Sequence, residues 1–114
     1  MEIEGYQKSH LRDGLSLIRF FTWLYNQVRV LKRKDLTEYE ASLKIDELRS
    51  KNESFIGPSF NTISSSGANS AIVHYSASKE DSAIINIDSI YLLDSGGHYW
   101  CDFYKQFASF MIAL

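Results

Sequence analysis

Apolar residues recur at helical spacing near the start of the chain. Successive intervals of 4, 3, 4 and 3 residues draw one apolar stripe along a helix face, and no proline interrupts residues 1–57. The stripe consists of Leu17, Phe21, Leu24, Val28 and Leu31. We therefore expect a helix from residue 2 to about residue 30, with Leu11 and Ile18 widening the stripe and Asp13 on the wetter side.

A second helix should follow a polar break at residues 32–35. Thr37 and Glu40 have the spacing of a capping box, in which the Thr37 hydroxyl accepts a hydrogen bond from the Glu40 amide and the Glu40 carboxylate reaches back to the helix start. We expect this helix to run to about residue 50. The residues expected to pack inward from the helix or across its start are Leu36, Ala41, Leu43 and Leu48.

The middle of the chain predicts strands. Residues 54–78 carry no formal charge across twenty-five positions, but they are too rich in apolar and β-branched residues for a solvated linker. We expect strands near 55–63 and at 71–75, the second of which bears His74, with a turn at 66–69 between them.

The last part of the chain predicts one more strand and a terminal helix. A strand at 90–93 should end at Asp94, and the paired glycines at positions 96 and 97 indicate a turn or bulge. Apolar residues after position 99 recur at intervals of 4, 3 and 4, which predicts a C-terminal helix. They are Phe103, Phe107, Phe110 and Leu114. Together the elements predict an α+β fold, with two N-terminal helices packed on a curved, mainly antiparallel sheet and a C-terminal helix after it.

Composition narrows the function classes. The 114 residues include twelve Lys and Arg against fourteen Asp and Glu, so the net charge of −2 gives no basic surface for nucleic acid. No uncharged apolar run reaches the roughly 18–20 residues that a membrane span needs, and the N-terminus lacks the pattern of a signal peptide. Cys101 is the single cysteine, which excludes an intramolecular disulfide and favours a reducing compartment. We expect a soluble protein with neither nucleic-acid nor membrane partners.

Few side chains invite a chemical interpretation. Asp94 follows an apolar strand and could point into a cleft, although an Asp at a strand end more often caps a turn or faces water. His74 could donate to an oxyanion or bind a metal, although a lone histidine is more often a structural hydrogen-bonding residue. Cys101 has no neighbouring cation or helix start that would activate its thiolate.

Seven segments that follow one another along the chain form a recognisable series. They are residues 2–5, 9–14, 19–24, 46–49, 60–67 (Phe-Asn-Thr-Ile-Ser-Ser-Ser-Gly), 69–75 (Asn-Ser-Ala-Ile-Val-His-Tyr) and 91–97 (Tyr-Leu-Leu-Asp-Ser-Gly-Gly). In this order they resemble the first part of the catalytic domain of the Xaa-Pro aminopeptidases (aminopeptidase P), which belong to the pita-bread metallopeptidases. The resemblance covers residues 1–99 and implies a partial pita-bread fold, with 100–114 as a divergent apolar tail.

The resemblance also implies chemistry. In that family two manganese ions are held by two Asp, one His and two Glu, and a metal-bridging hydroxide attacks the carbonyl before proline. By position, Asp94 corresponds to the first metal-binding aspartate. His74 corresponds to the catalytic and substrate-binding histidine that stabilises the tetrahedral intermediate. Xaa-Pro peptides as substrates and a cytoplasmic location follow from the same resemblance.

Other expected ligands are missing from this sequence. The second aspartate should stand eleven positions after Asp94, where Lys105 is found, and the remaining His and two Glu would fall beyond Leu114. We therefore expect a fragment or isoform that binds no manganese by itself and is inactive as written. A non-catalytic pita-bread module that binds a protein or peptide is the alternative, and an active enzyme with an unforeseen site is a third possibility.

Overall fold

The two apolar patterns form two helices. The computed structural model describes residues 2–101 and 104–113, with the side chains of residues 3–100. Helix α1 spans Glu2–Tyr25 and continues as a π-helical turn, η1, over Asn26–Val30, so the helix expected over this stretch is confirmed. Helix α2 spans Glu38–Ser50.

Thr37 caps α2 as expected. Its backbone is extended, and its hydroxyl accepts a hydrogen bond from the Glu40 amide at 3.1 Å. The other half of the predicted capping box is wrong, because the Glu40 carboxylate pairs with Arg33 at 2.6 and 2.8 Å. The planar guanidinium engages both carboxylate oxygens at once, which a single backbone amide cannot do.

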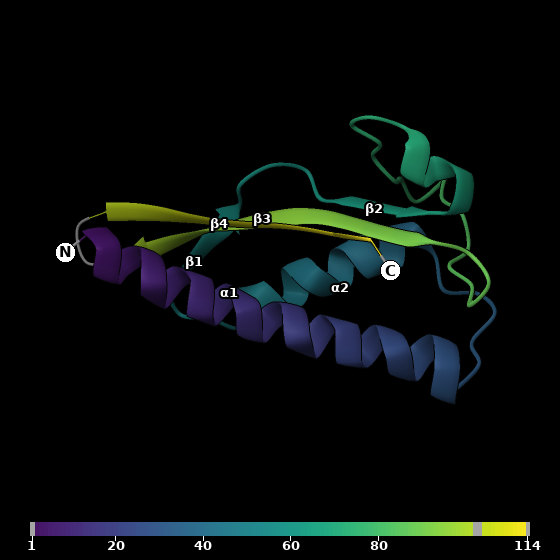
Figure 1. Cartoon of the computed structure of the whole chain (residues 1–114), viewed down its shortest axis with the longest axis horizontal. Coiled ribbons are helices and arrows are strands. Elements are labelled where there is room, and N and C mark those ends of the chain that lie inside the picture. Colours follow the sequence, from purple (N-terminus) through teal and green to yellow (C-terminus); the bar gives the residue numbers. More distant parts are fainter. Residues whose placement is uncertain (1, 102–103, 114) are drawn as a thin grey trace.

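The four strands form one antiparallel sheet. Strand β3 (Tyr91–Cys101) is the central one. Strand β1 (Phe55–Pro58) pairs with its last part, and β2 (Ile63–Ser66) pairs with its first part. Strand β4 (Tyr104–Ala113) pairs with β3 along most of the length of β3. Both helices lie on one side of this sheet, whereas the short 3-10 helix η2 (Gly67–Ala71) and the loop next to it rise on the other side (Figure 1). The α+β arrangement expected from the sequence is confirmed. Among the described residues, no helix has the length and apolar character to cross a membrane.

Several expected strand boundaries are wrong. The strand near 55–63 is interrupted, since β1 ends at Pro58 and β2 begins at Ile63. The strand at 71–75 and the turn at 66–69 are replaced by η2 and an irregular loop, and His74 has a left-handed backbone with φ of 55°. No turn interrupts β3 at its paired glycines; the register shift lies on β1, between Phe55 and Gly57.

The predicted C-terminal helix is also wrong. Residues 104–113 form β4, whose register places Ala113 opposite Leu92 and Tyr104 opposite Cys101. Backbone pairing with β3 over the whole segment gives this sequence a strand partner, and the 4-3-4 spacing of its aromatic residues does not outweigh it. Phe103 and Leu114, which belonged to the helix prediction, lie outside the described residues.

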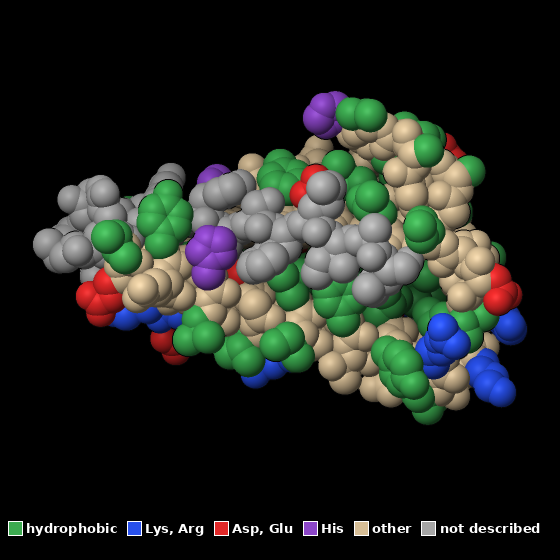
Figure 2. All heavy atoms as spheres, viewed as in Figure 1, with side chains coloured by type: hydrophobic (Ala, Val, Ile, Leu, Met, Phe, Trp, Pro, Cys, Tyr) green, Lys and Arg blue, Asp and Glu red, His purple; other side chains and the backbone are tan. Residues whose placement is uncertain are grey.

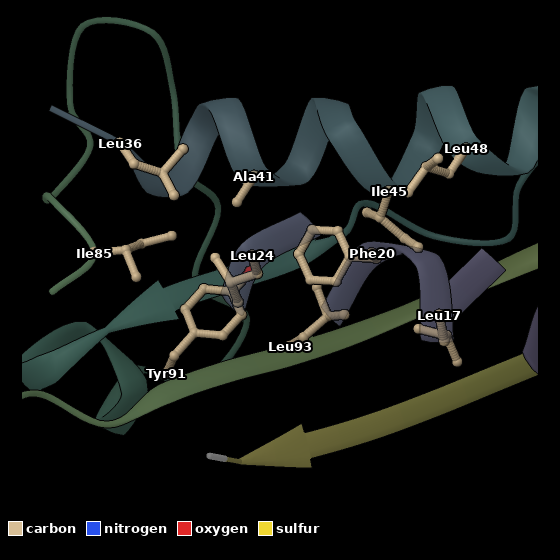
Figure 3. Close-up of a cluster of buried hydrophobic side chains, with 10 residues drawn as sticks. All are labelled: Leu17, Phe20, Leu24, Leu36, Ala41, Ile45, Leu48, Ile85, Tyr91 and Leu93. Atoms are coloured by element: carbon tan, nitrogen blue, oxygen red, sulfur yellow. The ribbon is translucent and has the colours of Figure 1, made fainter. Parts of the chain in front are cut away.

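The core fills the space between the helices and the sheet (Figure 3). Its buried residues are Leu17, Phe20, Leu24, Leu36, Ala41, Ile45, Leu48, Ile85, Tyr91 and Leu93. Leu36, Ala41 and Leu48 are buried as expected, but Leu43 is 51% exposed. On α1 the expected widening of the stripe is wrong, since Leu11 and Ile18 are 71% and 65% exposed and Phe20 is buried instead. The buried stripe therefore runs through Asp13, Leu17, Phe20 and Leu24, at intervals of 4, 3 and 4.

Candidate functional site

Asp94 lies on the face of the sheet opposite the helices. Its neighbours in β3 point toward the helices, because Leu93 belongs to the core and Ser95 accepts a hydrogen bond from Arg49 of α2. Side chains alternate along a strand, so the half-buried Asp94 side chain points the other way. The pairing of β3 places Ile63 of β2 directly opposite Asp94.

His74 lies beside the same face. Its exposed side chain lines a hollow of about 210 Å³, together with Phe60, Asn61, Ile63, Tyr75 and Ser76. Residues directly opposite each other in an antiparallel pair share one face, so Ile63 and Asp94 are neighbours on it. Ile63 thus connects the two predicted site residues, although no hydrogen bond or ion pair joins Asp94 to His74 in the described part of the chain.

The donor set does not fit a two-metal centre. Within residues 2–101 and 104–113, no group of three or more His, Cys, Asp or Glu side chains is placed to hold a metal ion. The register of β3 and β4 places position 105 opposite Trp100, whereas Met111 stands opposite Asp94. Trp100 lies six positions after Asp94 in β3, which corresponds to about 20 Å along the strand. Residue 105 therefore lies well along the strand from the position across from Asp94, which Met111 occupies.

A buried ionic network that the sequence analysis missed lies behind Asp94. Arg49 of α2 donates to both carboxylate oxygens of Asp13 at 2.7 and 3.0 Å, and Tyr99 donates to the same carboxylate at 2.5 Å. Arg49 also donates to Ser95, the residue that follows Asp94. Burial and the hydrogen bond to Asp13 raise the pKa of Tyr99. The network joins α1, α2 and β3 and fixes the strand that carries Asp94.

Asp13 was expected on the wetter side of its helix, and that expectation is wrong. The side chain is fully buried, because it continues the stripe of Leu17, Phe20 and Leu24 toward the N-terminus. Its partner, Arg49, stands 36 residues away in sequence. The one feature of the sequence that indicates burial of Asp13 is its helical spacing from Leu17, Phe20 and Leu24.

A second buried carboxylate, Glu38, organises the segment that carries His74. It accepts hydrogen bonds from the backbone amides of Ser66 and Ala83 at 2.5 and 3.0 Å, and from the Tyr75 hydroxyl at 2.5 Å. The side-chain amide of Asn69 donates to it at 3.1 Å. Burial and the neighbouring carboxylate raise the pKa of Tyr75 to about 12. The sequence offers no signal for this role, because an acid in the first turn of a helix is ordinarily explained by the helix dipole.

Comparisons with known proteins agree on one family. The sequence profile of metallopeptidase family M24 matches residues 4–109. A probable Xaa-Pro aminopeptidase P of Paracoccidioides brasiliensis (strain Pb03) is 49% identical over 98 residues, which cover 86% of this chain and 16% of that protein. A probable Xaa-Pro aminopeptidase P of Pyricularia oryzae is 46% identical, with the same coverage. The chain thus spans about one sixth of the length of these relatives.

A solved structure agrees with the sequence comparisons. The crystal structure of X-prolyl aminopeptidase from Caenorhabditis elegans, described as a cytosolic enzyme with a di-nuclear active site, matches with a TM-score of 0.81 and 34% identity. The match covers 97% of this chain and 18% of that one. The fold described above is therefore a segment of the fold of that enzyme.

Proposed function

Because the chain belongs to metallopeptidase family M24, we propose that it forms part of the catalytic domain of a manganese-dependent Xaa-Pro aminopeptidase. Such an enzyme removes the N-terminal residue that precedes proline, so the substrates would be Xaa-Pro peptides. The observation that carries the proposal is the similarity to the C. elegans enzyme over 97% of the chain. The cytosolic description of that relative supports a cytoplasmic location. In this proposal residues 1–99 belong to the catalytic domain and residues 100–114 form a divergent tail.

Asp94 and His74 have separate roles in the proposal. Asp94 supplies one carboxylate to the metal centre, and His74 donates a hydrogen bond to the substrate oxygen on which negative charge develops. Their placement on one face of the sheet, with Ile63 between them, supports these roles. One carboxylate cannot hold two divalent cations, which need several anionic ligands. We therefore propose that the 114-residue chain is inactive by itself.

The inactivity is tested on the chain as given. Calorimetric titration with Mn²⁺ should show no two-site binding, and Xaa-Pro peptides should not be hydrolysed when manganese is present. Turnover that Asp94→Ala abolishes would overturn this part of the proposal.

The role of Asp94 is tested in a chimera. Residues 1–99 of this chain replace the matching segment of the C. elegans enzyme, and hydrolysis of an Xaa-Pro peptide is measured with Mn²⁺. Asp94→Ala should reduce kcat/KM by more than about 100-fold, because a metal ligand is lost. Asp88→Asn is the matched control, since Asp88 is an exposed acid in the same part of the chain and should leave the rate unchanged. Equal activity of the two variants would contradict the assignment.

A non-catalytic module that binds a protein or peptide is the second candidate function. Exposed apolar side chains along α1, including Leu11, Leu15 and Ile18, favour it (Figure 2). The two candidate functions differ in whether they need a metal ion: hydrolysis does, and peptide binding by a non-catalytic module does not. Peptide binding by the 114-residue chain that persists in EDTA and in Asp94→Ala would support the binding module.

A further inference from the structure

Glu38 hydrogen-bonds to β2 and to the segment between β2 and β3 through its carboxylate, its amide and its carbonyl. Besides the four donors to its carboxylate, its amide donates to the Ala83 carbonyl at 3.0 Å, and its carbonyl accepts from the Ser64 hydroxyl at 2.8 Å. The residues that meet at Glu38 come from β2, from η2 and from the segment between η2 and β3. The loop is therefore fastened to the start of α2 at several points.

The charge of Glu38 is balanced by hydrogen bonds. The side chain is fully buried, and none of the salt bridges among the described residues includes it. A buried carboxylate without a cation is costly unless donors surround it, and two backbone amides, a phenol and a side-chain amide do so here.

His74 is held in a conformation that it would rarely adopt alone. Its φ of 55° is in the left-handed region, which is sparsely populated by residues other than glycine. The next residue, Tyr75, bonds to Glu38, and Asn69 donates both to the Tyr75 hydroxyl at 3.1 Å and to Glu38. These contacts close residues 69–75 into a loop whose two ends are tied to one carboxylate. Strained residues of this kind persist where the surroundings fix them, and they gather at functional sites.

We propose that Glu38 is a positioning residue that holds His74, through Tyr75 and Asn69, in its left-handed conformation at the rim of the hollow beside Asp94. The inference rests on the proposed role of His74 toward the substrate. Glu38 itself is fully buried, and within the described part of the chain Tyr75 is the residue of the hollow's lining that hydrogen-bonds to it. Its effect is therefore on where the imidazole stands.

The test measures local order in the 114-residue chain, without metal or substrate. Glu38→Gln removes one acceptor and places an NH₂ group among donors. Amide hydrogen exchange at Ser66, at Ala83 and through residues 69–75 should accelerate by at least about tenfold, the size expected from lost bonds to a charged group. The Cα and Cβ chemical shifts of His74, which report its backbone conformation, should move toward random-coil values.

Two further variants separate positioning from general stability. Tyr75→Phe keeps the buried carboxylate but cuts its link to His74, so it should move the His74 shifts while Ser66 and Ala83 stay protected. Glu40→Gln, a neighbouring acid that pairs with Arg33, should change neither. Equal acceleration of exchange throughout β3 and the loop, or unchanged His74 shifts in Tyr75→Phe, would overturn the proposal. If Glu38→Gln does not fold, the Tyr75→Phe result decides.

Because none of these measurements involves hydrolysis, failure of the positioning role is distinguishable from failure of the proposed function. Peptidase activity lost in the chimera with an intact Glu38 network would count against the function alone. Normal activity of the chimera together with unchanged His74 shifts in Glu38→Gln and in Tyr75→Phe would count against the positioning role alone.

Discussion

The buried pair of Asp13 and Arg49 gives the sharpest stability prediction. Both side chains have no solvent exposure, and the carboxylate accepts from Arg49 at 2.7 and 3.0 Å and from Tyr99 at 2.5 Å. Asp13→Ala would leave a buried guanidinium that has lost its carboxylate but keeps its bond to Ser95, and a Tyr99 hydroxyl without its acceptor. Removing one partner of a buried pair typically costs about 3–5 kcal/mol. A domain of this size has roughly 5–15 kcal/mol in total, so the variant should be near the limit of folding.

The assay is urea unfolding followed by circular dichroism. With a slope of about 2 kcal/mol per molar urea, Asp13→Ala should lower the midpoint by roughly 1.5–2.5 M. The double variant Asp13→Leu with Arg49→Met removes both charges, so its loss should be at least about 2 kcal/mol smaller than the sum of the single losses. Glu4→Gln is the control, because Glu4 and Lys8 form an exposed pair and should contribute at most about 0.5 kcal/mol. A loss below about 1 kcal/mol for Asp13→Ala, or additive single effects, would refute the reasoning.

The remaining predictions concern glycines and tyrosine ionisation. Gly97→Ala should destabilise the chain by about 1–3 kcal/mol in the same urea assay, because a Cβ there would lie 2.9 Å from the Tyr99 ring; Gly14→Ala, in an open helical position, should instead stabilise by about 0.5–1 kcal/mol. A stabilising Gly97→Ala, or equal effects of the two substitutions, would contradict the packing described. The pKa of Tyr75, raised to about 12 by burial and by Glu38, makes stability pH-dependent. The contribution is complete below the unfolded pKa of about 10 and is lost as pH rises toward 12, so unfolding measured from about pH 8 to 11 should show a decline that Tyr75→Phe reduces.

The helices could be predicted because their signals are local. The 3.6-residue period of α1 and the Thr37 cap of α2 depend on residues within a few positions of one another, and both are confirmed. The helical period of α1 did not show which residues beside the apolar stripe are buried, since that depends on where the sheet packs against the helix. Phe20 and Asp13 are buried for this reason, whereas Leu11 and Ile18 face solvent.

The failed predictions involve distant partners. The loop that carries His74 takes its shape from Glu38, about 36 residues earlier, and not from its own β-branched residues. Residues 104–113 pair with β3 although the spacing of their aromatic residues is helical. The assignment of Asp94 and His74 to one site came from resemblance and stays a prediction. Their common face could not be predicted, because it depends on the register that sets Ile63 opposite Asp94.

The central place of β3 has a consequence for synthesis on the ribosome. Strands β1 and β2 do not pair with each other, and both find their partner only in β3. Phe55 leaves the ribosome long before Tyr99, opposite which it pairs, and at roughly 5–20 residues per second the delay is about 2–9 s. During that time the nascent helices have no sheet to cover. Chaperone binding to the nascent chain should therefore end when β3 emerges from the exit tunnel.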